Sequence, residues 1–297
     1  MGSQRMVVKV LETEFGSRAA GADLPDIPVI TIEAGRRWLG TDLRDLWAHR
    51  DLFYFLVLRD IKVRYKQTAL GVSWAVLQPF LTMVVFTVFF GKLAKIPSDG
   101  VPYAIFAYAG ILPWTYFSNA VSNSSNSLIG NASLITKVYF PRVIVPGAAV
   151  GAALADFLIA FAIMFAMMIY YRVMPGAGIA MLFPLTAICT LLATAVGMWT
   201  SALNVKYRDI RYALPFFIQL WMFVTPVIYP TSFVPDRWRW VLLLNPLTGL
   251  IEGFRSALFS RPFDWPAIGI SCVLTIALAL YAAYSFTRME RGFADVI

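Results

Sequence analysis

The chain has 297 residues, of which 59% are hydrophobic and 14% charged, and its mean hydropathy is +0.68. This composition excludes a soluble globular domain, in which about a quarter of the residues are charged. The formal net charge of +8 suits basic loops beside an anionic membrane leaflet better than a nucleic-acid groove. The two cysteines, Cys189 and Cys272, lie in apolar stretches and form no metal-binding or disulfide pattern.

The N-terminal part of the chain divides into two segments. Residues 1–40 contain no apolar core of a signal peptide and carry Pro25 and Pro28, so we expect a partly disordered cytoplasmic extension. Residues 41–68 include an apolar face at i, i+4 spacing, formed by Phe53, Val57, Ile61 and Tyr65. This pattern predicts an amphipathic helix in the cytoplasmic membrane interface. A soluble helix packed on a partner is the alternative.

The remainder, residues 69–297, is predicted to be an all-α integral membrane domain. About 20 apolar residues are needed to cross a bilayer. Six stretches meet this length, near Leu70–Phe90, Val101–Val121, Val143–Tyr171, Ile179–Leu203, Ala213–Tyr229 and Trp265–Thr287. Six spans place both termini on one side, and the excess of Lys and Arg beside that side predicts that it is cytoplasmic.

The stretch before the last span is apolar but interrupted. Trp240–Phe259 is split by Asn245-Pro246 and carries Glu252 and Arg255, so neither half is long enough to cross. We expect two short re-entrant helices on the periplasmic side, shielded by protein.

A long segment, Ser118–Arg142, separates the second and third predicted spans. Its polar first part, Ser118–Ser127, is interpreted as the end of the span and a connector, and Leu134–Pro141 as a short docking segment. The sequence contains no G-x-x-x-x-G-K-[ST] loop, no metal-ligand cluster and no catalytic constellation. We therefore predict a non-enzymatic subunit without cofactor or metal, which receives energy through contact with a partner.

Polar and small residues within the spans leave alternatives open. Asp156 lies in mid-span and is either a proton or ion relay, or a carboxyl that hydrogen-bonds a neighbouring helix. Gly147 and Gly151, and likewise Ala193, Gly197 and Ser201, have small-xxx-small spacing. This spacing favours close helix packing inside the chain over a specific dimer face.

Aromatic residues are concentrated in the first and fifth predicted spans. Aromatic rings suit the C–H faces of sugars, so these side chains are candidates to line a substrate path; the alternative is contact with lipid or the core. They are Trp74, Phe86, Phe89, Phe216, Phe217, Trp221 and Phe223.

Five motifs together resemble a known family. They are LGVSWAVLQPFLTMVVFTVFFG at Leu70–Gly91, LITKVYFPR at Leu134–Arg142, NVKYRDIRY at Asn204–Tyr212, TPVIYP at Thr225–Pro230 and NPLTGLIEGFRSALF at Asn245–Phe259. In this order, from about Asp42 to the C-terminus, the chain resembles the ABC-2 type permease subunits that export bacterial polysaccharides such as O-antigen, capsule or teichoic acid.

The resemblance implies a homodimer in the bacterial inner membrane that binds two separate ATP-binding cassette ATPase subunits and exports a lipid-linked, O-antigen-like glycan. Its partners would include membrane lipids but no nucleic acid. Spans one and five would line the path, and Val241–Phe259 would form periplasmic gate helices with Asn245, Pro246, Glu252 and Arg255. The implied ATPase-coupling residues are Leu134, Ile135, Lys137, Val138, Tyr139, Phe140 and Pro141, with Arg208 and Asp209 in a second cytoplasmic loop.

Three other functions remain. An ABC-2 exporter of another amphipath, such as a lipid or antibiotic, is less favoured because of the aromatic spans and the split gate segment. An ion-coupled transporter is disfavoured because Asp156 is alone and the halves show no repeat. A membrane glycosyltransferase is disfavoured because no acid or metal cluster is visible.

Overall fold

A computed structural model describes residues 43–66, 71, 73–290 and 293. The predicted N-terminal extension and Leu70, the first residue of predicted span one, lie outside the described residues. The elements are α2 (Leu43–Ala48), α3 (Arg50–Lys66), α4 (Ser73–Phe86), the π-helix η1 (Thr87–Leu93), α5 (Tyr103–Gly130), α6 (Ala132–Lys137), α7 (Ile144–Tyr171), the 3₁₀ helix η2 (Ala177–Met181), α8 (Leu182–Lys206), α9 (Ile210–Val224), the 3₁₀ helix η3 (Thr231–Phe233), α10 (Asp236–Leu243), α11 (Pro246–Phe259) and α12 (Trp265–Glu290).

The described residues form helices and no strands, and four helical segments are long and apolar enough to cross a membrane. These segments are Ser73–Leu93, Ile144–Tyr170, Ala177–Lys206 and Trp265–Glu290. They coincide with the first, third, fourth and sixth predicted spans. The chain is therefore a multi-pass, all-helical membrane protein.

The other two predicted spans correspond to α5 and α9. Helix α5 has 28 residues, but the serines and asparagines of its second half lower its hydropathy. Helix α9 has 15 residues, about 22 Å of helix, and ends at Val224. The prediction that span five continues to Tyr229 is wrong, because Thr225 leaves the helical conformation and a turn follows. The count of six spans stays a prediction.

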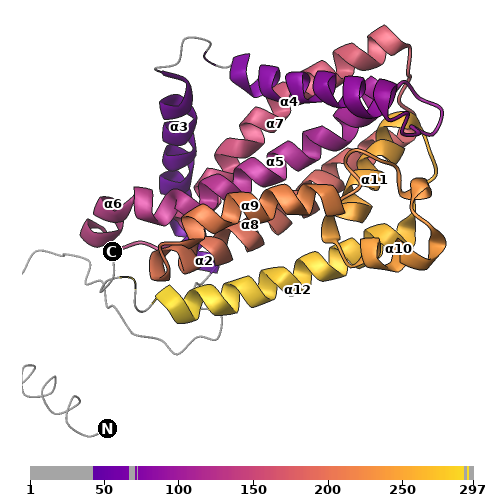
Figure 1. Cartoon of the computed structure of the whole chain (residues 1–297). Helices are drawn as coiled ribbons and strands as arrows, with labels where there is room; N and C mark the ends of the chain where they lie inside the picture. Colours follow the sequence, from indigo (N-terminus) through magenta and orange to yellow (C-terminus); the bar gives the residue numbers. More distant parts are fainter. Residues whose placement is uncertain (1–42, 67–70, 72, 291–292, 294–297) are drawn as a thin grey trace, which may run out of the picture. The chain divides into compact units, whose positions relative to one another are not determined.

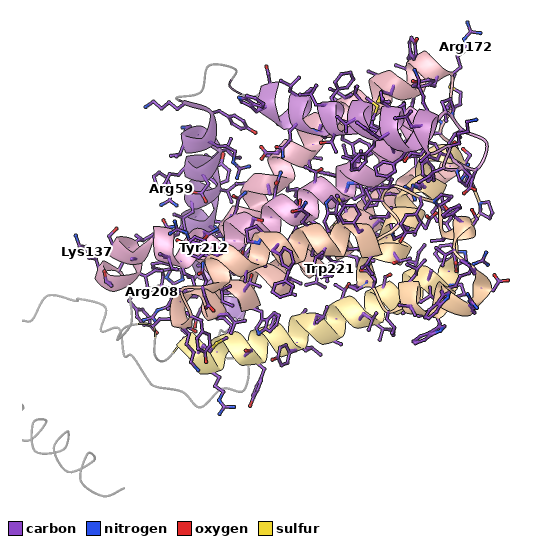
Figure 2. The ribbon with its side chains drawn as sticks, in the orientation of Figure 1. Arg59, Lys137, Arg172, Arg208, Tyr212 and Trp221 are labelled. Atoms are coloured by element: carbon purple, nitrogen blue, oxygen red, sulfur yellow. The ribbon has the colours of Figure 1, made fainter. Side chains whose placement is uncertain are left out.

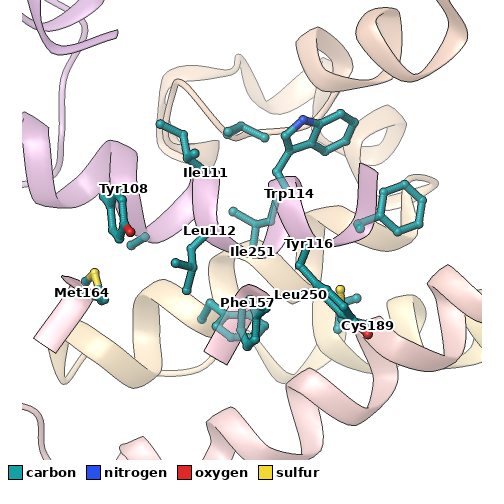
Figure 3. Close-up of a cluster of buried hydrophobic side chains, with 14 of the residues drawn as sticks. Tyr108, Ile111, Leu112, Trp114, Tyr116, Phe157, Met164, Cys189, Leu250 and Ile251 are labelled. Atoms are coloured by element: carbon teal, nitrogen blue, oxygen red, sulfur yellow. The ribbon is translucent and has the colours of Figure 1, made fainter. Parts of the chain in front are cut away.

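Helix α5 forms the centre of the fold. It packs against α7 and α8 along its length and also contacts α4, α9 and α11 (Figure 1). Tyr108, Ile111, Leu112 and Trp114 of α5 lie among buried side chains of α7, α8 and α11, such as Met164 (Figure 3). Helix α5 thus connects the helices that pack around it.

The polar second half of α5 is helical, so the prediction that part of Ser118–Ser127 is a connector is wrong, whereas its assignment to the end of span two stays a prediction. Ser124 and Ser125 are fully buried. At Gly197 of α8 an added Cβ would lie 2.6 Å from the Cβ of Ser124. The serines are accommodated because they are small enough for α5 and α8 to approach closely. The small-residue pattern of α8 therefore serves packing within the chain, as expected.

Helix α3 lies across the ends of the longer helices (Figure 1) and packs on α7. A Cβ at Gly151 of α7 would lie 3.0 Å from Val57 and 3.5 Å from Phe53. Phe53 and Val57 of the predicted apolar face therefore contact α7, although Phe53 stays 39% exposed, and Tyr54 and Phe55 are exposed. Helix α3 thus packs on protein on one side and also exposes apolar residues, and its placement in the membrane interface stays a prediction.

The two ends of the long helices carry different elements. Helix α6 lies at one end, whereas α10 and α11 lie at the other (Figure 1). Helices α10 and α11 meet at Asn245-Pro246, where the sequence predicted two short helices. Their placement as re-entrant helices stays a prediction.

Candidate functional site

The predicted coupling segment divides into buried and exposed side chains. Leu134, Ile135 and Phe140 pack in a cluster that also contains Leu56 of α3 and residues of α7, α8 and α12. The exposed side chains follow: Lys137, Val138 (51% exposed) and Tyr139 (80% exposed), whereas Pro141 is half-buried. The buried residues can hold α6 in place, and the exposed ones are available to a partner.

The second predicted coupling loop lies at the same end of the molecule. Arg208 and Asp209 are exposed in the turn between α8 and α9, and Figure 2 shows Arg208 and Lys137 at the α6 end, opposite Arg172. The backbone carbonyl of Asp209 accepts a hydrogen bond from the N–H of Tyr212 at 2.9 Å, which fixes the start of α9. The exposed residues Lys137, Val138, Tyr139, Arg208 and Asp209 are called the α6 surface below.

At the opposite end, the predicted gate residue Arg255 is a buried structural centre. Its side chain is 1% exposed and donates hydrogen bonds to the carbonyls of Pro226 (2.7 Å) and Val227 (2.8 Å) and to Glu252 (2.9 Å). The guanidinium also stacks 3.7 Å from the ring centroid of Phe106. Arg255 thus joins α11, α5 and the turn after α9.

Asn245, together with Pro246 at the start of α11, connects the same elements. Its side-chain oxygen accepts hydrogen bonds from the Trp221 indole N–H (3.0 Å) and the Leu247 backbone N–H (3.1 Å), and its amide donates to Thr225 (2.8 Å). Pro246 is buried at the first turn of α11. These bonds cap α11 and fasten the end of α9 to it.

The predicted path aromatics separate into two groups. Trp221 packs edge-on against Phe117, 5.1 Å between ring centroids, and Phe86 packs on Phe90 at 5.5 Å, so both are partly buried. The exposed members are Trp74 and Phe89 on the α4–η1 segment, and Phe216, Phe217 and Phe223 on α9. No ring contact joins the two exposed sets within the part of the chain that the structure describes. Each set presents an open aromatic face.

Asp156 is paired across helices. The Arg64 guanidinium and the Tyr65 hydroxyl of α3 both donate to its carboxylate. Burial raises the pKa of Tyr65, and the nearby charge of Arg64 opposes this effect only in part. The phenol therefore stays protonated and can donate its hydrogen bond. Of the two interpretations of Asp156, the structure supports the carboxyl bound to a neighbouring helix. Arg64 could not be predicted as the partner, because it lies 92 residues away from Asp156 in the chain.

These features define a class: a helical membrane protein with exposed charged and aromatic residues at one end and a tightly bonded short-helix element at the other. The family model for the ABC-2 type transporter matches residues 51–259. The chain belongs to the ABC-2 type transporter family.

Curated relatives cover most of the chain. The O-antigen export system permease protein RfbA of Myxococcus xanthus is 29% identical over 86% of this chain and 98% of the relative. The protein of the same name from Klebsiella pneumoniae is 27% identical, over 83% and 95%. The polysialic acid transport protein KpsM of Escherichia coli is 22% identical, over 76% and 90%. The relatives are transport permeases, and the family implies an ATPase partner.

Proposed function

We propose that the chain is the permease subunit of an ATP-driven exporter that moves a lipid-linked polysaccharide, O-antigen-like, across the bacterial inner membrane. The observation that carries this proposal is the match, over more than four-fifths of the chain, to relatives named as O-antigen export permeases. The exposed aromatic faces of α4 and α9 support a substrate of many sugar rings, because a ring can slide over such faces without a fixed charge holding it.

The energy for transport would enter at the α6 surface. Two copies of a separate ATPase subunit would bind a permease homodimer, with both termini and α6 in the cytoplasm. Exposed Tyr139 and Val138 supply the aromatic and apolar contacts that dominate protein interfaces. ATP hydrolysis would reside in the partner.

The contacts within the chain can transmit a movement of α6 to the other helices. Helix α6 follows directly on α5, and Leu134, Ile135 and Phe140 join it to α3 and α12. Displacement of α6 would therefore move α5 and α3 together, and α5 contacts α4, α9 and α11. In a homodimer this would part the aromatic faces of α4 and α9 and open the path toward the gate helices.

A transport experiment tests the proposal. The chain is co-expressed with an ATPase encoded beside it in cells that make the lipid-linked glycan but lack their own permease. Surface glycan is then measured by whole-cell labelling. We expect surface glycan only with both subunits and an ATPase able to hydrolyse ATP. The assignment is contradicted if cells make intracellular glycan normally but show none on the surface. Export of a lipid or antibiotic instead would also contradict it.

A further inference from the structure

A cavity of about 350 Å³ opens between α3, α4, α5 and α7 of a single chain. This volume falls in the range of about 300–1,000 Å³ that is typical of small-ligand sites. The cavity is separate from the exposed face of α9, where the second set of path aromatics lies.

Polar and aromatic residues reach the cavity at helical spacing. On α5, Thr115, Asn119 and Asn123 recur every four residues, so they share one face of the helix. On α4, Trp74 and Gln78 do the same. Two helices therefore turn a polar or aromatic stripe toward the same space.

The three amides have no hydrogen-bond partner among the described residues. No hydrogen bond is recorded for the side-chain amides of Gln78, Asn119 and Asn123 within the described residues. Each amide offers two donors and an acceptor. Gln78 and Asn123 are exposed and Asn119 is half-buried, so all three amides are accessible to a ligand in the cavity that can donate and accept hydrogen bonds.

The charges of the lining cancel. Arg64 and Asp156 line the cavity but are bound to each other, so they leave no net charge for a free ion. Trp74, 49% exposed, adds an aromatic face. Amide groups beside an aromatic plate match a neutral polyhydroxylated ring, which offers hydroxyls on its rim and C–H groups on its faces.

We propose that this cavity is a binding site for a neutral sugar residue of the exported glycan, formed within one permease chain. Asn119, Asn123 and Gln78 bind the hydroxyl groups and Trp74 stacks on the ring. The proposal rests on the proposed function for the identity of the substrate. It places a sugar site within one chain, on the α4 side of the proposed path and away from α9.

Photocrosslinking in cells that export the glycan tests the site. The photoreactive residue benzoylphenylalanine replaces Ala75, which lines the cavity without belonging to its polar set. It also replaces Phe217 on the proposed path and, as a control, Leu158, an exposed residue of α7 outside the lining. After irradiation the permease is purified in denaturant and its adducts are identified by periodate labelling and lipid mass spectrometry.

The expected result is glycan attached at positions 75 and 217 and none at 158. Glycan at 217 alone overturns the inference and leaves the proposed function standing. Phospholipid without glycan at 75 also overturns it, in favour of a headgroup pocket. Failure of the unsubstituted chain to export glycan is the separate result that overturns the proposed function.

Substitution of the amides gives a second test. Asn119→Leu and Gln78→Leu are each expected to lower export at limiting glycan supply about two- to tenfold, since each removes hydrogen bonds to the ligand. Asn119→Gln should restore part of the rate. Because neither amide is hydrogen-bonded within the part of the chain that the structure describes, the melting temperature and yield of the permease–ATPase complex should not fall. Full export by both leucine variants, or a loss of export that follows a loss of stability, contradicts a binding role.

Discussion

At the scale of single residues, the charged side chains inside this protein are fixed by partners that are remote in sequence. Arg255 donates to three backbone carbonyls and to Glu252 in a fully buried position. Gly110 of α5 permits this approach, since a Cβ there would lie 2.7 Å from the guanidinium. A buried cation of this kind persists because most of its donors are paired; within the described residues its Nε alone has no partner.

Arg255→Met is therefore expected to destabilise the protein by about 3–5 kcal/mol, because it leaves the carbonyls and Glu252 without their donor. The measurement is thermal unfolding of the purified protein in detergent. Arg239→Gln is the matched control, since Arg239 pairs with Asp236 on the half-exposed surface of α10 and should change stability by less than about 0.5 kcal/mol. Equal melting temperatures for both variants would contradict the structural role of Arg255.

Asp156→Asn is expected to loosen α3 from α7. The change removes the charge that binds Arg64 and weakens the bond from Tyr65, and a charge-assisted hydrogen bond contributes about 1.5–3 kcal/mol. Hydrogen exchange of the α3 backbone amides should accelerate by about 10- to 100-fold. Asp51→Asn, whose carboxyl is exposed beside Arg50, serves as the control and should leave exchange unchanged. If both variants exchange at the rate of the parent protein, the pair does not hold α3.

At the scale of elements, close approach of helices depends on small residues. Helices α5 and α8 meet where Ser124 faces Gly197, and α3 meets α7 where Val57 faces Gly151. Their low hydropathy alone predicts that the serines lie in a loop. At a contact between helices, however, their small size matters more than their polarity.

Gly197→Ala is expected to cost about 1–3 kcal/mol, because the new methyl group overlaps Ser124 in a packed interface. Thermal unfolding measures the loss. Gly130→Ala at the end of α5 is the control, since nothing lies within 4 Å of a Cβ there. Ser124→Gly in the Gly197→Ala background should restore stability; if the pair is no more stable than Gly197→Ala alone, the overlap is not the cause.

The α6 surface gives a prediction on coupling. Tyr139→Ala should lower binding of the ATPase and transport at least about tenfold, because exposed tyrosines are frequent interface anchors. Tyr170→Ala, at the far end of α7, provides a matched control: the two tyrosines are 80% and 79% exposed. Both variants should fold normally. If Tyr139→Ala binds the ATPase and exports glycan as well as Tyr170→Ala does, α6 has no role in coupling.

At the scale of the whole molecule, the two ends of the helices are chemically different. The exposed cations Lys137 and Arg208 lie at the α6 end, opposite the exposed Arg172 (Figure 2). Arg255 of α11 is buried and bonded. The segments beside the α6 end hold the larger share of Lys and Arg. Cationic loops are retained in the cytoplasm during insertion. This asymmetry supports a cytoplasmic α6.

Cysteine labelling tests the orientation. In a background with Cys272→Ser, Lys137→Cys and Met174→Cys place exposed thiols at opposite ends, and Cys189 is buried. A membrane-impermeant maleimide on intact spheroplasts should modify Met174→Cys at once and Lys137→Cys only after permeabilisation. The reverse pattern would mean that α6 faces away from the cytoplasm.

The amino-acid sequence by itself determined the class of protein and the family. It also predicted the four helical segments that are long and apolar enough to span a membrane among the described residues. These follow from composition, from uninterrupted apolar length and from motifs such as Asn245-Pro246, all of which act locally along the chain. Membrane insertion selects for length and hydrophobicity, so such patterns stay readable without a fold.

Only the tertiary structure decided where the polar residues go. Ser124 belongs to a helix contact, Arg255 is a buried centre and Trp221 is bonded to Asn245 rather than open to a path. Asp156 finds Arg64 across 92 residues, and Asn119 joins Gln78 at one cavity. The physical reason is the same in each case: a polar group inside a membrane protein is defined by its hydrogen-bond partner, and packing, not sequence spacing, brings that partner near.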